Sequence, residues 1–171
     1  MSKPSLIFLP GAWHSPEIYD TIITKLNSYG YKSTALPLQA VIQKPAVNDL
    51  QPDINALRTA VLKEADAGND VMVVGHSWGG LIVCGALEGL SKQERAKEGK
   101  TGGVVKLGFL AAFVPPENVS LIQAFGGNPP PWYDVKVTFE TNYEDKHTEC
   151  YTGTMGDMQR SHPNLLPRSK S

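Results

Sequence analysis

The sequence is poor in cysteine and lacks the spacings of the common metal and nucleotide motifs. Only two cysteines, Cys84 and Cys150, occur in 171 residues, too few for a disulfide framework. Cys84 is expected to be a small buried side chain. We find neither a cysteine and histidine ligand spacing nor a glycine-rich phosphate loop. The sequence therefore predicts neither a metal nor a cofactor.

The chain also lacks an excess of charge and a long apolar run. The formal net charge is −1, and no basic stripe with interleaved aromatic residues suggests a nucleic-acid surface. No apolar stretch is long enough to span a bilayer, and no secretory h-region follows the N-terminal residues. We therefore expect a cytoplasmic protein that contacts a small molecule rather than nucleic acid or a membrane. The oligomeric state is left open.

Short apolar runs alternate with segments of helical spacing along the first two-thirds of the chain. The expected strands are residues 6–9, 33–36, 71–74 and 104–114, and the expected helices are residues 16–26, 52–67 and 80–90. Continuous apolar runs of this length are typical of buried parallel strands. The alternation predicts an α/β fold, a mostly parallel sheet with helices on both faces.

The character of the sequence changes at Pro115. Residues 1–134 are expected to form the α/β core, with a surface loop at residues 91–103 and a lid that starts at about residue 115. The remainder, residues 135–171, carries a modest strand signal at its start and little periodicity afterwards. We expect it to be an atypical, poorly ordered C-terminal segment.

The stretch VMVVGHSWGG, residues 71–80, carries the clearest chemical signal. It reads as a strand, a G-x-S-x-G turn around Ser77 and the start of a helix, which is the context that a nucleophile elbow requires. A serine hydroxyl that attacks a carbonyl needs donors for the developing oxyanion. The N–H of Trp78, directly after the nucleophile, and the N–H of Ala12, after the first strand, are the expected donors. An idle serine in a glycine-rich turn is the alternative.

Three segments resemble the α/β-hydrolase superfamily, in particular its branch of small esterases, methyl esterases and hydroxynitrile lyases. They are LIFLPGAWHSPEIY at residues 6–19, residues 71–83 and LGFLAAFVP at residues 107–115. The resemblance implies Ser77 as nucleophile, Ala12 and Trp78 as oxyanion donors, and His14 near the mouth of the site. The oxyanion loop usually reads His-Gly in this superfamily, whereas here it reads Pro10-Gly11.

The acid and histidine of the expected triad have no clear position. In the superfamily they follow the serine in that order, and such domains run longer than this chain, so the fold is expected to be truncated. The weak candidates are His147 and His162 as base, with Asp134, Glu144 or Asp145 as acid. Little periodicity surrounds either histidine, which favours exposed loops for both.

Three further residues lie close to the motif. His76 precedes the nucleophile on a tight turn and is expected to pack behind the elbow rather than to act as base. Trp13 and Trp78 are candidates for the substrate pocket or for the core, and the position of Trp78 beside Ser77 favours the pocket for its ring.

These features lead to a serine hydrolase of the esterase type that acts on a small ester or related carbonyl compound through an acyl-enzyme on Ser77. The alternative is a catalytically silent or truncated protein of the same fold that serves as a ligand-binding or interaction module. A lyase or cyclase reaction on the same fold stays open.

Overall fold

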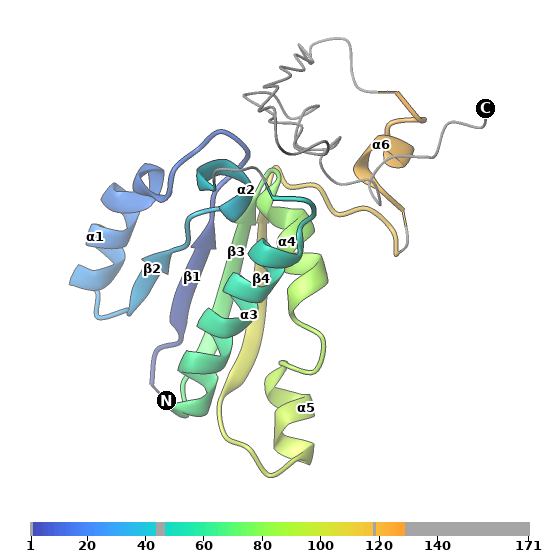
Figure 1. Ribbon diagram of the computed structural model, residues 1–171. Helices are drawn as coiled ribbons and strands as arrows, with labels where there is room; N and C mark the ends of the chain where they lie inside the picture. The colour runs from blue at the N-terminus through green and yellow to red at the C-terminus, as the bar shows by residue number, and fades with distance from the viewer. Residues whose placement is uncertain (1, 44–46, 118, 129–171) are drawn as a thin grey trace, which may run out of the picture. The chain divides into compact units, whose positions relative to one another are not determined.

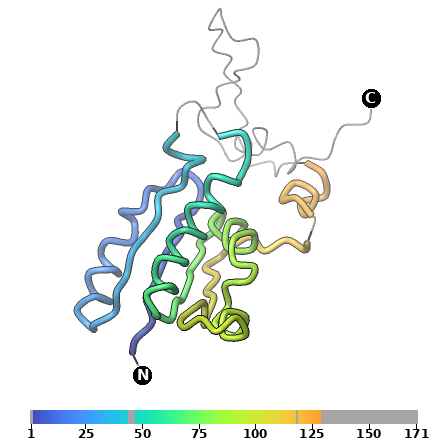
Figure 2. Tube along the Cα trace, turned by 60° about the horizontal axis from the view of Figure 1, so that its bottom comes forward, coloured from blue at the N-terminus to red at the C-terminus, as the bar shows by residue number. Residues whose placement is uncertain are grey.

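The computed structural model describes residues 2–43, 47–117 and 119–128. The chain divides into two compact units. The first comprises Met1–Leu38 and Asp53–Val114, and the second comprises Gln39–Pro52 and Pro115–Ser171. All four described strands belong to the first unit, which Figures 1 and 2 trace from blue through yellow.

The sheet has four parallel strands in the order β2-β1-β3-β4. They are β1 (Ser5–Leu9), β2 (Ser33–Ala35), β3 (Asp70–His76) and β4 (Gly103–Leu110). The predicted parallel sheet is confirmed. The strand expected to reach residue 114 ends at Leu110, because Ala111 takes a φ of 42° that extended backbone does not allow.

Helices cover both faces of this sheet, as predicted. The helical elements of the first unit are η1 (Pro16–Tyr19), α1 (Asp20–Ser28), α3 (Gln51–Asp66), α4 (Gly79–Ala86) and α5 (Lys92–Lys97). On one face, Ile23 and Leu26 of α1 pack on a buried cluster that contains Phe8 and Val74. On the other face, α4 approaches Gly75 so closely that a Cβ there would lie 2.9 Å from Val83 Cγ2.

The segment expected to be a surface loop, residues 91–103, contains the helix α5. Ser91 is its N-cap, and the Ser91 Oγ accepts a hydrogen bond from the Glu94 N–H at 3.1 Å. The Ser91 hydroxyl also donates to Glu94 Oε2 at 2.6 Å. The letters S-K-Q-E at residues 91–94 are a capping-box pattern that predicts a helix start. The loop prediction was wrong because it weighed polarity above this pattern.

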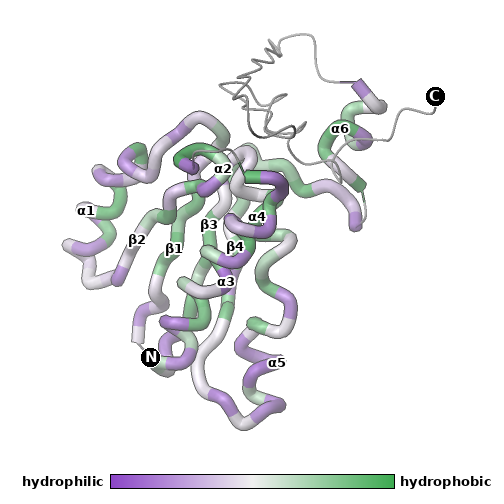
Figure 3. The backbone as a smooth tube through the Cα atoms, viewed as in Figure 1, coloured by the Kyte–Doolittle hydropathy of each residue, from purple (hydrophilic) through white to green (hydrophobic). Residues whose placement is uncertain are grey.

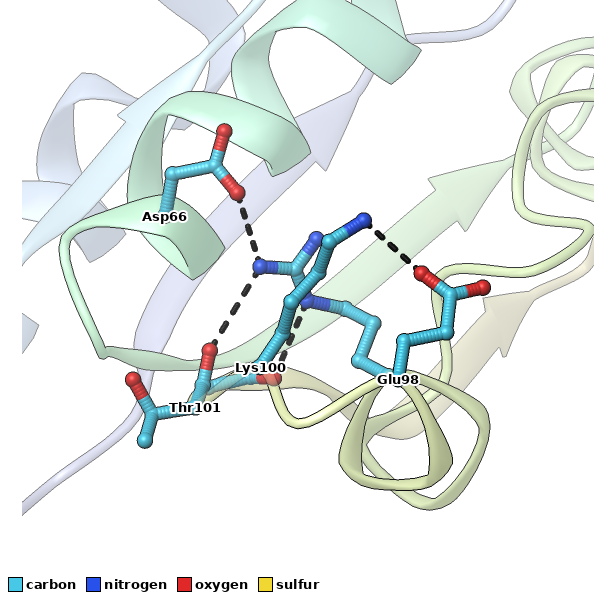
Figure 4. A network of polar contacts seen from close by, with 6 residues as sticks. Asp66, Glu98, Lys100 and Thr101 are labelled. Carbon is cyan, nitrogen blue, oxygen red and sulfur yellow. Dashed lines mark hydrogen bonds and ion pairs between the residues drawn. The ribbon is translucent and has the colours of Figure 1, made fainter.

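The buried Arg95 anchors α5 to the end of α3. Its Nη2 donates to Asp66 Oδ1 at 2.7 Å and to the Thr101 carbonyl at 3.5 Å, and its Nε donates to the Gly102 carbonyl at 3.2 Å. Figure 4 shows Asp66 and Thr101 converging on this guanidinium, with the Lys100–Glu98 ion pair beside it. Because the guanidinium bonds both to the end of α3 and to the carbonyls of residues 101–102, it holds the segment between α5 and β4 against α3.

Two expected burials are corrected. The strand β4 was expected to be buried, but beyond Val104 its large apolar side chains are 41–51% exposed, and β3 is the only described strand that pairs with it. Figure 3 shows that apolar residues run along β4 as they do along β1 and β3. Cys84 is exposed rather than buried, because α4 buries Leu81–Val83 and Ala86 and turns positions 84–85 outward.

The described residues of the second unit form two short helices. These are α2 (Gln39–Ile42), in a segment expected to be a loop, and α6 (Leu121–Ala124), in the region expected to begin a lid. A capping box between Ser120 and Gln123 starts α6. The segment at residues 135–171 lies outside the described residues.

Candidate active site

The turn between β3 and α4 holds Ser77 in a left-handed conformation. Its φ is 50°, and Ser77 is one of three described non-glycine residues with positive φ. A left-handed backbone is uncommon for a serine, and such strain persists where the surroundings enforce it. The sharp bend lets the chain pass from strand to helix within two residues and leaves Ser77 half-buried at the tip.

The neighbouring strand braces this bend through the main chain. The Ser77 N–H donates to the Leu110 carbonyl at 3.1 Å, and the Phe113 N–H donates to the Ser77 carbonyl at 3.0 Å. Both partners come from the end of β4 and the loop after it. The positive φ of Ser77 is thus stabilised by hydrogen bonds from a segment more than thirty residues away.

Two glycines make the close approach around Ser77 possible. A Cβ on Gly79 would lie 2.9 Å from the Leu9 and Pro10 carbonyl oxygens. A Cβ on Gly11 would lie 3.0 Å from Ser77 Cβ and 3.1 Å from His76 Nδ1. The loop after β1 therefore packs directly on the elbow. This contact requires the absence of a side chain at both positions.

The loop after β1 carries Ala12 and His14. Ala12 is buried, and its carbonyl lies 2.9 Å from His14 Nδ1. The His14 N–H donates to the Gly11 carbonyl at 3.2 Å, which closes a tight turn around Ala12. The Ala12 N–H donates no main-chain hydrogen bond within the described part of the chain. That N–H sits on the loop that touches Ser77.

Two histidines stand beside the elbow. The His14 and His76 rings are 6.0 Å apart between centroids and meet edge-on at 70°. His14 is exposed. His76 is half-buried behind the turn, and its Nδ1 has no hydrogen-bond partner among the described residues. The weaker sequence candidates, His147 and His162 with Asp134, Glu144 and Asp145, lie outside the described residues.

Trp13 and Trp78, which the sequence left open between pocket and core, differ in exposure. The Trp78 ring is 0% exposed and belongs to the core, whereas the Trp13 ring is 49% exposed. Trp78 is the N-cap residue of α4 and is fully buried, so the expectation that its ring lines a pocket is corrected. The main-chain N–H of Trp78 remains a candidate hydrogen-bond donor to an oxyanion, together with that of Ala12.

Sequence reasoning missed the residues that brace the elbow. Leu110 and Phe113 act through main-chain groups, which any residue type supplies, and Ala111 adopts a φ of 42° without being a glycine or an asparagine. Gly80 is the one sequence signal that could have indicated this contact. A Cβ there would lie 2.5 Å from the Phe113 carbonyl oxygen.

Within residues 2–43, 47–117 and 119–128, no group of three or more histidine, cysteine, aspartate or glutamate side chains is arranged to hold a metal ion. Among the same residues, no helix has both the length and the apolar character that crossing a bilayer requires.

Comparisons with known proteins find relatives of this chain. An α/β hydrolase nvfD of Aspergillus novofumigatus is 35% identical over 121 residues, which cover 71% of this chain and 48% of that protein. A probable hydrolase R7 of Phoma sp. is 29% identical over 130 residues, which cover 74% of this chain and 50% of that protein. The chain thus spans about half the length of these curated relatives.

Solved structures share the fold. Tomato methylketone synthase I in complex with 2-tridecanone superposes with a TM-score of 0.60 at 21% identity, covering 85% of this chain and 55% of that one. The sequence profile of the alpha/beta hydrolase family matches residues 6–157. Since this match covers more than half of the chain, the chain belongs to the alpha/beta hydrolase family.

Proposed function

We propose that the protein is a serine hydrolase of the esterase type in which Ser77 is the nucleophile. Family membership supports a hydrolase-type function. The observation that carries the finer proposal is the strained φ of 50° at Ser77, on a strand-to-helix turn against which Gly11 of the neighbouring loop packs. Backbone strain of this kind costs about 1–3 kcal/mol and is concentrated at functional sites.

In this proposal the Ser77 Oγ attacks the carbonyl carbon of an ester while a base accepts the hydroxyl proton. The carbonyl oxygen becomes an oxyanion, which the N–H groups of Ala12 and Trp78 stabilise, and the start of α4 adds its positive dipole end. The alcohol leaves with a proton, and water then releases the acid from Ser77. Removal of one such donor costs about 3–4 kcal/mol in the transition state.

The base is the open part of this mechanism. Neither His14 nor His76 is hydrogen-bonded to a carboxylate within the described residues, so these two rings do not form an acid–histidine–serine relay there. The candidates named from the sequence are His147 or His162, oriented by Asp134, Glu144 or Asp145.

Neither His14 nor His76 is hydrogen-bonded to a carboxylate within the described residues, and this observation favours a second candidate function, a ligand-binding module without turnover. It predicts that a ligand binds equally well to wild type and to Ser77→Ala, and that no product forms.

Labelling with a fluorophosphonate tests the proposal, because this probe reacts only with an activated serine. We expect wild type to be labelled on Ser77 and Ser77→Ala to lose the label. Ser28→Ala, which removes an exposed serine from α1, serves as the matched control and should label normally. Folded wild-type protein that takes up no label would overturn the proposal and favour the binding module.

A further inference from the structure

The side chain of Trp13 is exposed although its residue is strained. It follows β1 in the loop that packs on Ser77, its φ is 63°, and its ring is 49% exposed. A positive φ is unfavourable for a bulky residue, and exposure of an indole to water adds a second cost. A strained backbone and an exposed indole at one residue, beside a proposed nucleophile, indicate that the ring is held at the surface to contact a substrate rather than by packing in the core.

Parallel strands bring the residues that follow them to one edge of the sheet. Leu9 of β1 lies opposite Gly75, and Leu110 of β4 lies opposite His76. Ser77, which follows β3, therefore lies between the loop of Trp13 on one side and the end of β4 on the other.

The β4 side of this edge is also apolar and open. Leu110 is 51% exposed and Val114 is 54% exposed. The segment from Gly108 to Pro116 (GFLAAFVPP) contains no charged residue, and neither does the loop from Leu9 to Trp13 (LPGAW). A polar or ionised substituent would find no countercharge in either segment, whereas an apolar substituent would cover exposed side chains.

We propose that Trp13, with Leu110 across Ser77, determines specificity for esters whose acyl group is apolar, either a medium-length alkyl chain or an aryl group. This inference rests on the proposed serine hydrolase function and names its substrate class. Trp13 binds the apolar group and takes no part in bond making, while Ser77 reacts as described above.

A series of fluorophosphonates that differ only in their apolar substituent tests the inference, because the rate of labelling is measured without a need for turnover. Ethyl, octyl and phenylbutyl probes provide the small, alkyl and aryl arms. We expect octyl or phenylbutyl to label wild type about 10-fold faster than ethyl, since burial of a few methylene groups gives at least this ratio. Faster labelling by octyl would indicate an alkyl acyl group, and faster labelling by phenylbutyl an aryl acyl group.

Trp13→Asn removes the ring while it keeps a residue that tolerates positive φ, so the loop should stay folded. We expect the ratio of the labelling rates with the preferred long probe and with ethyl to fall about 10-fold in this variant. Trp13→Phe should restore most of the preference. Tyr29→Ala is the matched control: Tyr29 is 60% exposed at the C-terminal end of α1, and Lys3 contacts its main-chain carbonyl, which the substitution retains.

The outcomes separate this inference from the proposed function. Equal labelling of wild type by ethyl and long probes would overturn the apolar specificity and leave Ser77 as the nucleophile. An equal loss of preference in Tyr29→Ala would show that the effect is unspecific and would also overturn it. If none of the probes labels folded protein, the serine hydrolase proposal fails and the specificity fails with it.

Discussion

The main-chain N–H of Ser77 donates a hydrogen bond to the carbonyl of Leu110 at 3.1 Å, so the strand beside the elbow holds the strained residue in place. The bond links the end of β4 to the turn that follows β3. It shows how a residue with a φ of 50° persists without a glycine at that position. Four experiments, beyond the labelling tests above, probe this arrangement and the elements that support it.

Ser77→Gly should stabilise the protein while it abolishes fluorophosphonate labelling. Glycine adopts positive φ without steric cost, so relief of the strain should raise the free energy of unfolding by about 1 kcal/mol. Urea denaturation followed by circular dichroism measures the change. Ser77→Ala keeps the steric cost and should stay within about 0.5 kcal/mol of wild type. A Ser77→Gly variant less stable than Ser77→Ala would show that the turn is unstrained.

Gly79→Ala should destabilise the protein because the added Cβ would lie 2.9 Å from Leu9 Cβ and from two carbonyl oxygens of the β1 loop. Main-chain atoms do not move aside cheaply, so we expect a loss of about 1–3 kcal/mol in the free energy of unfolding. Gly85→Ala, on the same helix, meets the flexible end of Ile54 at 2.9 Å and should cost less. Equal costs for the two variants would contradict the close packing of loop and elbow.

Arg95→Ala should cost about 2–3 kcal/mol, because it leaves the Gly102 and Thr101 carbonyls without their donor and empties a buried site. Asp66→Asn should cost less than about 1 kcal/mol, since the Asp66 side chain is 64% exposed. Thermal unfolding of the two variants gives the comparison. A larger loss for Asp66→Asn would mean that the ion pair, rather than the carbonyl bonds, anchors α5.

Glu64 should make stability depend on acid pH. Burial alone raises the pKa of Glu64, but hydrogen bonds from Lys32 Nζ at 2.6 Å, Ser5 Oγ at 2.8 Å and Asn69 Nδ2 at 3.0 Å outweigh it and hold the pKa below the ordinary value of 4.5. A carboxylate with a lowered pKa in the folded state contributes stability that is complete above the unfolded pKa and is lost as the pH falls through the folded pKa.

Urea titrations of wild type and Glu64→Gln at pH 7, pH 5 and successively lower pH measure this contribution. We expect wild type to be more stable at pH 7 by about 1–3 kcal/mol. The difference should shrink only below the ordinary pKa of 4.5. A difference between the two proteins that stays constant through the acid range would exclude Glu64 as the source.

Elements with strong local patterns were predictable from the sequence. The apolar run of β3, the glycines around Ser77 and the Pro16 start of η1 each carry a local rule, and the structure follows them. Polar helices were harder to predict, because α5 has no apolar stripe and its only signal is the N-cap serine Ser91 with Glu94 three residues later. Exposure was predicted least well. Cys84 and β4 were assigned by residue type and the Trp78 ring by its position beside Ser77, whereas exposure depends on which neighbours the tertiary fold supplies.

The sequence alone determined the family, the parallel sheet and the position of Ser77, because strand, glycine turn and helix are encoded within a dozen consecutive residues. The tertiary structure decided what surrounds that serine. It packed Gly11 on the elbow, tied the Ser77 main chain to Leu110 and Phe113, buried Trp78 and left Trp13 open. These relationships join residues distant in the chain through main-chain hydrogen bonds and close packing, and such contacts leave no periodic or compositional trace in the sequence.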